Sequence, residues 1–302
     1  MSLEGKVAIV TGSGRGLGLA YAQELARQGS AVIVNDGDEA TAAEAVASIT
    51  DAGGRATAVV APVGSTETAQ QLVQAAVDTY GRLDILVTNA GVLRDRVLWK
   101  MSDEDFDAVI ATHLRGSFTC GRAAARHFRE QGRGGRIILI GSPAGQFGSF
   151  GQTNYAAVKA GIVAMARTWS LELARAEVTV NTVVPTALSP MTATIPEYTQ
   201  AYEDYLAGKP IPDELRRDRA LGSADDVAPL VVWLASDEAA HVTGQAIGIG
   251  GDRLTLYAHP DVLATAERAG GWDAGAIDDA WRERFAPLAQ PSGPPSRREP
   301  AS

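Results

Sequence analysis

The sequence predicts an α/β protein built on a doubly wound, seven-stranded parallel sheet. Short apolar runs alternate with longer helical stretches from the first residues onward, which is typical of parallel strands joined by helices. The runs consist almost entirely of Val, Ile, Leu and Ala, which indicates burial on both faces of the sheet. The chain has 302 residues, 45% of them hydrophobic, enough for a large core.

The elements follow one another with glycine or asparagine at the turns. The first strand is expected at residues 7–10, before a glycine-rich turn, and the first helix at residues 17–27. A second strand at 31–35 and a second helix at 39–50 follow. The further strands are expected at residues 56–60, 85–88, 136–140, 178–184 and 245–249, and all but the last lead into a helix or a lid-like segment.

Two regions lie outside this pattern. Residues 186–223 are rich in Pro, Tyr and charge, so we expect a lid over the carboxyl edge of the sheet. Residues 252–290 should form a helical extension of the main domain at 1–251, because apolar residues recur in two clusters, at 262–269 and at 272–285. That extension would pack on the main domain or on a neighbouring subunit. The remaining residues, 291–302, have the composition of a disordered tail.

Composition excludes several classes of function. The 27 Lys and Arg against 36 Asp and Glu give a net charge of -9, which repels phosphate backbones, so no nucleic-acid partner is expected. The longest apolar runs, such as 137–140, are far shorter than the roughly 20 residues of a membrane helix, and residues 1–6 do not resemble a signal peptide. The single cysteine, Cys120, allows no intrachain disulfide and favours a cytoplasmic location.

The turn after the first expected strand has the composition of a phosphate-binding loop. Its glycines allow a sharp turn and let a pyrophosphate approach the amides at the start of a helix. Such a turn can also be simple tight packing, but its place between a strand and a helix favours dinucleotide binding. The candidate cofactor-binding residues in this turn are Gly12, Arg15, Gly16, Leu17 and Gly18.

Asp36 ends the second expected strand, about twenty residues after the turn. A carboxylate at this position can accept hydrogen bonds from the hydroxyls of an adenosine ribose. It would repel the 2′-phosphate of NADP, and Asp38 and Glu39 add to the negative charge. Arg15 is the nearby cation that would favour NADP. We therefore predict NAD as the cofactor, and no metal.

Three residues form a candidate catalytic set: Ser142, Tyr155 and Lys159. Tyr155 and Lys159 are four residues apart in an expected helix, so both project from one face. A phenol has a pKa of ~10, and lowering it by ~3 units would need ~4 kcal/mol of differential stabilisation, which we assign to the Lys159 cation. Tyr155 would then exchange a proton with a carbonyl or alcohol oxygen while hydride moves to or from nicotinamide. Ser142 would hold that oxygen, although a serine here can also be a turn cap.

These motifs together resemble the short-chain dehydrogenase/reductase family over about residues 3–251, a family with a Rossmann-type fold. The ordered set comprises residues 11–18, Asp36, Asn89, Ala90, Gly91, Ser142, Tyr155, Lys159 and 181–185. Within the family, GVLRDR at 91–96, HLRGSF at 113–118 and FGQTNYAAVKAG at 150–161 are most similar to (3R)-hydroxyacyl-CoA dehydrogenases. Pro185 followed by Met191 and Thr192 fits the same group.

The resemblance implies further roles. Asn89, Ala90 and Gly91 would line the adenine-ribose side of the cofactor. Tyr155 and Lys159 would also contact the cofactor, and the segment from Pro185 to Leu188 would meet the carboxamide. The resemblance also implies a homo-oligomer, either a tetramer or a dimer. The helices around residues 155–174 and the helix before them would then form an interface between subunits.

The sequence departs from the family pattern at three positions. Pro62 replaces the usual Asp before Val63, so only a backbone contact of Val63 with the cofactor carries over. His113 replaces the Asn that often completes the catalytic set; it can support a water relay to Lys159 or simply pack in a helix. Thr186 replaces the Gly that often follows the Pro.

We predict an NAD-dependent oxidoreductase that interconverts a hydrophobic secondary alcohol and a ketone. The candidate substrates are a 3-hydroxyacyl thioester, which the resemblance suggests, and an alicyclic or steroid-like ketone. One alternative is an NADPH-dependent 3-oxoacyl reductase, which Arg15 permits. Another is a catalytically silent dinucleotide-sensing or scaffold subunit, which Tyr155 beside Lys159 opposes. The substrate pocket should be mainly apolar. Its expected walls are Gly145, Gln146, Phe147, Phe150, Leu188, Met191, Tyr198, Tyr202 and Tyr205; the alternative for the three tyrosines is that they only pack the lid onto the body.

Overall fold

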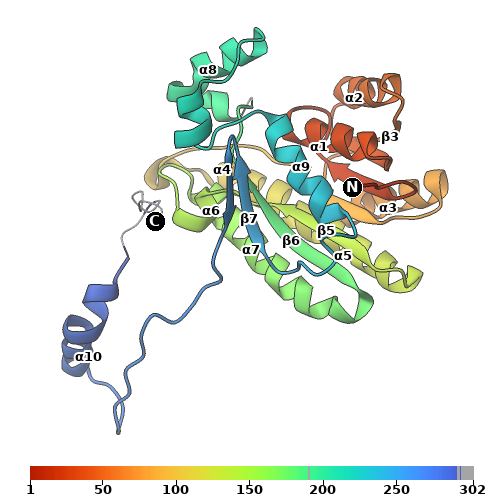
Figure 1. Ribbon diagram of the computed structural model, residues 1–302. Helices are drawn as coiled ribbons and strands as arrows, with labels where there is room; N and C mark the ends of the chain where they lie inside the picture. Colours follow the sequence, from red (N-terminus) through yellow and green to blue (C-terminus); the bar gives the residue numbers. More distant parts are fainter. Residues whose placement is uncertain (190, 291–292, 294–302) are drawn as a thin grey trace. The chain divides into compact units, whose positions relative to one another are not determined.

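The computed structural model describes residues 1–189, 191–290 and 293, and the chain divides into two compact units. The first unit, Met1–Tyr257, contains one eight-stranded sheet in the order β3-β2-β1-β4-β5-β6-β7-β8 (Figure 1). The strand order reverses between β1 and β4, and such a reversal opens a ligand crevice at the carboxyl ends of the strands. The predicted Rossmann-type α/β fold is therefore confirmed.

The strands closely follow the apolar runs of the sequence. Seven of them are parallel, namely β1 Val7–Thr11, β2 Ala31–Asp36, β3 Arg55–Val60, β4 Ile85–Thr88, β5 Gly135–Ile140, β6 Val178–Pro185 and β7 Ala246–Gly250. The prediction of seven strands was wrong by one, because β8, Arg253–Leu256, pairs antiparallel with β7. Gly251, with φ of 51°, allows the tight reversal between them.

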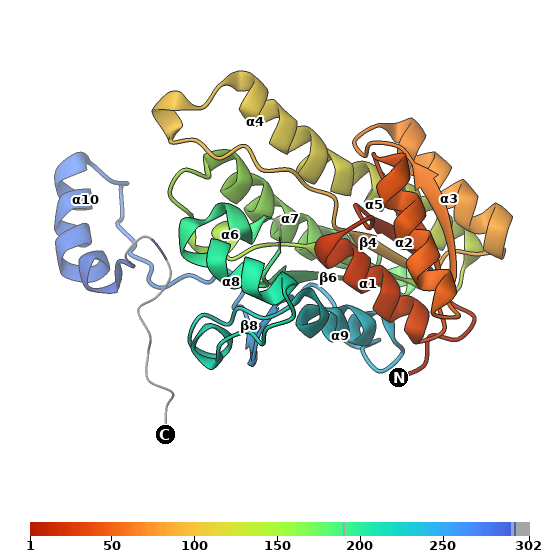
Figure 2. The same ribbon diagram turned by 90° about the horizontal axis from the view of Figure 1, so that it is seen from above.

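Helices cover both faces of the sheet, as a doubly wound fold requires (Figure 1). One face packs against α1 Gly16–Arg27, α2 Glu39–Asp51 and α9 Ala224–Ala235. The other packs against α3 Thr66–Tyr80, α5 Gly116–Gln131 and α7 Thr153–Glu172. Shorter elements are η1 Leu98–Lys100, α4 Asp103–Val109, the π-helical η2 Ile110–Arg115, α6 Ala144–Phe147 and η3 Ala174–Ala176. Of these, α4 lies beside α7 (Figure 2).

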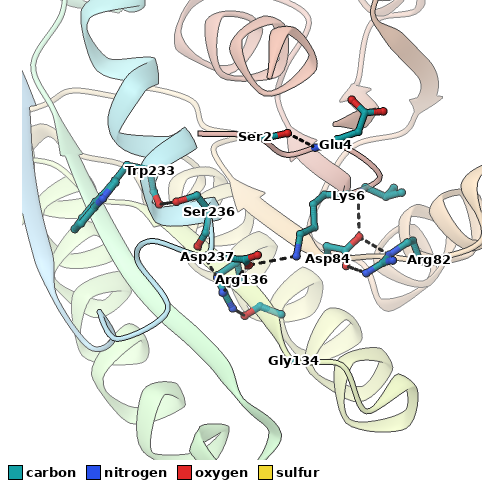
Figure 3. A network of polar contacts seen from close by, with 12 residues as sticks. Ser2, Glu4, Lys6, Arg82, Asp84, Gly134, Arg136, Trp233, Ser236 and Asp237 are labelled. Atoms are coloured by element: carbon teal, nitrogen blue, oxygen red, sulfur yellow. Dashed lines mark hydrogen bonds and ion pairs between the residues drawn. The ribbon is translucent and has the colours of Figure 1, made fainter. Parts of the chain in front are cut away.

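A polar network joins the amino ends of the central strands (Figure 3). The buried carboxylate of Asp84 accepts a 2.9 Å hydrogen bond from the backbone N–H of Val7 and pairs with Arg82. The exposed carboxylate of Asp237 pairs with Lys6 at 3.4 Å and with Arg136 at 3.5 Å. The network lies at the edge of the sheet opposite to the crevice, so it holds the strands without touching the site.

The predicted lid is present and is anchored at its base. It contains η4 Thr192–Thr194, α8 Pro196–Leu206 and the π-helical η5 Glu214–Asp218, and α8 projects from the body of the unit (Figure 1). The N–H of Thr186 donates to Ile249 O at 2.9 Å, and the N–H of Leu188 donates to Gly222 O at 2.7 Å. The first end of the insertion is thus tied to β7, and its two ends are tied to each other.

The second unit begins at Ala258 and differs in part from the predicted extension. Helical turns occur at α10 Ala274–Ala280, the π-helical η6 Trp281–Phe285 and η7 Ala286–Leu288. Residues 262–269, one of the two apolar clusters of the predicted helical extension, form no helix, and a helix this short is marginal by itself in water. The predicted disordered tail lies outside the described residues except for Gly293. Across the residues described, no helix has the length and apolar character needed to cross a membrane.

Candidate active site

Two glycines of the turn between β1 and α1, Gly12 and Gly18, are packed too closely to carry a side chain. A Cβ on Gly12 would lie 2.6 Å from Ala90 Cα, and one on Gly18 would lie 2.1 Å from Gly12 O. The Asn89 amide donates to Gly12 O at 2.9 Å, which ties the turn to the end of β4. These contacts hold the turn in a shape that exposes the amides at the start of α1, the cradle that a pyrophosphate needs.

A cavity of about 600 Å³ extends from this turn. Most of the predicted cofactor-binding residues line it, namely Gly12, Arg15, Gly16, Leu17, Gly18, Asp36, Val63, Asn89, Ala90 and Gly91. Pro62, at the departure from the family pattern, lines it as well. The predicted residues Tyr155, Lys159, Pro185 and Leu188 are not among its described lining residues, and Leu188 is buried. Sequence reasoning missed Thr112 and Ser189, which the fold brings to the cavity from distant segments.

The carboxylate of Asp36 is held at one end of the cavity. Its Oδ2 accepts from the N–H of Gly14 and its Oδ1 from the N–H of Asp38, each at 3.2 Å. Hydrogen bonds from Thr41 lower the pKa of Asp38, and the Arg15 cation adds to this effect. Arg15 therefore lies within the field of this acidic group, which offsets part of its attraction for a phosphate.

The structure brings the predicted catalytic residues together. Ser142 follows β5, and its hydroxyl oxygen accepts from the N–H of Ala144 at 3.2 Å. Tyr155 and Lys159 lie on α7, with the ammonium nitrogen 5.4 Å from the centroid of the Tyr155 ring. That ammonium also donates to Ile140 O at 2.6 Å. The end of β5 and the first turns of α7 thus assemble one polar cluster.

The electrostatics of this cluster differ from the expectation. Burial raises the pKa of Tyr155 to about 12; a hydrogen bond with Ser142 opposes this and the charge of Asp95 adds to it. Burial also lowers the pKa of Lys159 to about 7. The expected lowering of the Tyr155 pKa by Lys159 is therefore wrong for this arrangement, because removing the hydroxyl from water outweighs the stabilising contacts.

His113 belongs to the same cluster, although it comes from a different element. It lies in the π-helical η2, is 2% exposed, and meets the ring of Tyr155 edge to face with 5.4 Å between centroids. Its Nε2 lies 2.9 Å from Val92 O, and its Nδ1 is buried without a hydrogen-bond partner among the described residues. Burial first, and the Lys159 charge second, lower the pKa of His113 to about 3, so the ring is neutral.

A clamp that the sequence did not predict holds the start of α7. The Asn154 side chain is fully buried and donates to Arg94 O at 3.0 Å. The N–H of Arg96 donates to Gly151 O at 2.8 Å, and the Gln152 amide donates to the carboxylate of Asp95 at 2.8 Å. The residues that form the clamp stand in the sequence as RDR at 94–96 and GQTN at 151–154. Their pairing could not be predicted, because some 55 residues separate them and only the folded chain brings them together. The clamp fixes the position of Tyr155.

The expected substrate walls are only partly assembled. Met191 of the lid contacts Tyr155, and the ring of Phe147 packs at 5.9 Å from that of Tyr257. Phe150 is 88% exposed. Tyr198, Tyr202 and Tyr205 lie on α8, where burial raises the pKa of Tyr198 and of Tyr205.

A glycine cradle beside a Ser-Tyr-Lys cluster, on a Rossmann-type sheet, defines an oxidoreductase that binds a dinucleotide. The comparison with known families agrees, because the family model described as short chain dehydrogenase matches residues 6–200. The chain belongs to this family. It is thus an enzyme that acts on CH–OH groups with a NAD(P) cofactor, which leaves the scaffold alternative without support.

Its relatives cover most of the chain. The hydroxyacyl-CoA dehydrogenase ChsB1 of Mycobacterium tuberculosis is 40% identical over 297 residues, 94% of this chain and 90% of that protein. The 3-oxoacyl-[acyl-carrier-protein] reductase FabG of Thermotoga maritima is 38% identical over 252 residues, 83% of this chain and 98% of that protein. A crystal structure of a short chain dehydrogenase from Mycobacterium avium matches with a TM-score of 0.83 and 34% identity, covering 97% of this chain and 99% of that one.

Proposed function

We propose that this protein is an NAD-dependent dehydrogenase that interconverts 3-hydroxyacyl and 3-oxoacyl thioesters. The observation that carries the cofactor choice is the Asp36 carboxylate, held at the cavity by the Gly14 and Asp38 amides. It suits the 2′-hydroxyl of NAD and repels the 2′-phosphate of NADP. The substrate class is supported by the similarity to a hydroxyacyl-CoA dehydrogenase over 94% of the chain.

The residues present fit such a cofactor. The amides of the glycine-rich turn would hold the pyrophosphate, Asp36 the adenosine ribose, and Asn89 to Gly91 the wall beside it. Lys159 would bond the nicotinamide ribose, and the segment from Pro185 to Leu188 would meet the carboxamide. When bound, the nicotinamide ring supplies or accepts the hydride.

Tyr155 would transfer the proton. With a pKa of about 12, its hydroxyl is protonated at neutral pH and can donate to the oxygen of a ketone as hydride reaches the carbon. Ser142 donates a second hydrogen bond to the same oxygen and stabilises its negative charge. In the reverse direction the phenolate must form first, and the Lys159 nitrogen, 5.4 Å from the ring centroid, would stabilise it when it is protonated.

His113 would complete this set as the support of a water relay to Lys159. Its Nε2 lies 3.0 Å from the N–H of Val92 and 2.9 Å from Val92 O, and its buried Nδ1 has no partner among the described residues. In the tautomer that carries its proton on Nε2, Nδ1 is an acceptor. A neutral imidazole beside a buried ammonium can accept from a water that the ammonium also contacts. This arrangement supports a positioning role for His113 rather than proton transfer to substrate.

The test compares NAD⁺ with NADP⁺ in the oxidation of 3-hydroxybutyryl-CoA. We expect kcat/KM to favour NAD⁺ by at least about tenfold, and Asp36→Ala to narrow the preference by about the same factor. Asp51→Ala is the control, because it removes a carboxylate at the last residue of α2, outside the lining of the cavity. Equal or better use of NADP⁺ by the unmodified protein would contradict the proposal.

A second candidate is an NADPH-dependent 3-oxoacyl reductase. The observation that favours it is Arg15, which lines the same cavity as Asp36, and FabG of Thermotoga maritima is a 3-oxoacyl reductase by name. In this case the enzyme would reduce acetoacetyl-CoA more efficiently with NADPH than with NADH. Arg15→Ala would weaken the binding of NADPH and leave the binding of NADH nearly unchanged. The same assay distinguishes the two candidates.

We also propose that a second copy of the chain covers the outer face of α5 and α7. A hollow of about 390 Å³ lies there, with Phe118 at its wall under the Arg122 guanidinium and Trp169 opposite. Phe118 remains 42% exposed, and Leu171 of α7 is 80% exposed. Light scattering should give a dimer or tetramer, and Phe118→Asp should reduce the measured mass while Val60→Asp on β3 does not.

The cytoplasmic location stays a prediction.

A further inference from the structure

The catalytic hydroxyl has a neighbour from the lid. The thioether sulfur of Met191 lies 3.9 Å from the Tyr155 hydroxyl oxygen. Met191 also lines the cofactor cavity, together with Ser189, whereas Tyr155 is not among the described residues that line it. One flexible side chain therefore touches both the cavity and the proton donor, at the place where a substrate oxygen has to arrive.

Hydrogen bonds hold Thr192, the residue next to Met191 in the chain, in place. The Ser189 N–H donates to the Thr192 hydroxyl oxygen at 2.7 Å, and the Thr192 N–H donates back to the Ser189 hydroxyl oxygen at 3.2 Å. The Thr192 hydroxyl also donates to Ala187 O at 2.9 Å. Moving Thr192 away from Ser189 and Ala187 would break several hydrogen bonds at once. Rotating the Met191 side chain would break none of these, because methionine is unbranched and has three rotatable bonds.

The contact is also a weak one. A thioether is a poor hydrogen-bond acceptor, whereas a carbonyl oxygen accepts from a phenol at about 2.7 Å. Exchange of the sulfur for a substrate oxygen is therefore favourable at the hydroxyl itself. An acyl chain can fill the apolar volume that the Met191 side chain leaves when it rotates.

We propose that the Met191 side chain is a gate on Tyr155: it covers the catalytic hydroxyl and swings away when a 3-oxoacyl substrate takes its place. This rests on the proposed role of Tyr155 as the acid. Because displacement occurs as substrate binds and before the proton moves, the gate acts on KM and not on kcat. It makes Met191 a specificity-determining residue, since only a carbonyl compound with enough apolar surface displaces it.

Two substitutions move the gate in opposite directions. Met191→Ala removes the cover, so KM for acetoacetyl-CoA should fall at least about threefold while kcat changes less than about twofold. Met191→Gln keeps the length and the unbranched shape but presents a strong acceptor to the Tyr155 hydroxyl, so KM should rise by about the same factor. Met165→Ala on α7 is the control, because this methionine packs against the core and should leave KM unchanged.

A second measurement does not depend on activity. With the Met191 side chain removed, water reaches the Tyr155 hydroxyl, so this hydroxyl should ionise at lower pH in Met191→Ala than in the unmodified protein. The tyrosinate absorbance measures this, and the spectrum of the same protein carrying Tyr155→Phe is subtracted to isolate the signal of Tyr155. The other charged or titratable groups that face Tyr155, namely Lys159, His113, Asp95 and Tyr21, stay in place in this comparison.

The outcomes separate the gate from the proposed function. A fall in KM for Met191→Ala, a rise for Met191→Gln and the titration shift together support the gate. An unchanged or higher KM for Met191→Ala, an unchanged KM for Met191→Gln, or an unshifted titration overturns it. Full activity of Tyr155→Phe would instead overturn the role of Tyr155 itself, whatever Met191 does.

Discussion

The buried ammonium of Lys159 donates a 2.6 Å hydrogen bond to the carbonyl oxygen of Ile140, the last residue of β5. This bond ties α7, which carries Tyr155 and Lys159, to the centre of the sheet. Burial lowers the pKa of Lys159 from 10.5 to about 7. Folding thus places Lys159 where its charged form is less stable than in the unfolded chain, so Lys159 lowers the stability of the folded protein.

Replacing Lys159 should therefore stabilise the fold in a pH-dependent way. A base whose pKa is lower in the folded protein than in the unfolded chain destabilises the fold fully below its folded pKa, and the penalty is relieved as pH rises from about 7 to 10.5. We expect Lys159→Met to have the larger free energy of unfolding near neutral pH, by up to a few kcal/mol at about 1.4 kcal/mol per pKa unit.

Urea denaturation at about pH 6.5 and at about pH 9.5 tests this. The advantage of Lys159→Met should shrink at the higher pH. Lys209→Met is the control, because Lys209 is 64% exposed on the lid and should show the same difference at both pH values. An advantage that is absent near neutral pH, or that grows with pH, would contradict the assignment of the lowered pKa.

Tyr155→Phe keeps the ring and its edge-to-face contact with His113 but removes the proton donor. We expect kcat to fall by at least about a hundredfold, while the dissociation constant for NADH, measured by fluorescence titration, changes little. Residual activity above about a tenth would assign the proton transfer to another group.

Asp95→Asn should shift the pH dependence of the reaction. Oxidation of an alcohol needs the phenolate of Tyr155, so its rate rises with pH, and the charge of Asp95 raises the Tyr155 pKa. Removing that charge while keeping an acceptor for Gln152 should move the rising limb of kcat/KM to lower pH, by about half a unit for one partly screened charge. Asp103→Asn, at the first turn of α4, should leave the limb in place. A shift to higher pH would reverse the assigned sign.

Asp84→Ala should destabilise the fold without changing the chemistry. It leaves the buried N–H of Val7 without its acceptor and Arg82 without its partner, which costs about 1–3 kcal/mol. Asp237→Ala in the same network (Figure 3) should cost less than about 1 kcal/mol, because its side chain is 77% exposed. Thermal unfolding measures both, and kcat at a temperature where the protein is folded should stay unchanged.

The sequence by itself determined the architecture and the main chemical groups, because both depend on local patterns. Apolar runs placed seven strands to within a residue or two, and β4 lies at the predicted residues. The glycine-rich turn and Asp36 were recognisable because a phosphate cradle and a ribose acceptor must follow consecutive strands. The four-residue spacing of Tyr155 and Lys159 on one helix placed two side chains together without knowledge of any other contact.

Only the tertiary structure decided how these groups behave. The raised pKa of Tyr155 results from burial, which no spacing along the chain reveals. Three contacts join segments far apart in sequence: His113 of the π-helical turn with Tyr155, Asp95 with Gln152, and Met191 with the Tyr155 hydroxyl. Local residue patterns specify elements and candidate groups, whereas desolvation and contact between distant segments arise only when the elements pack.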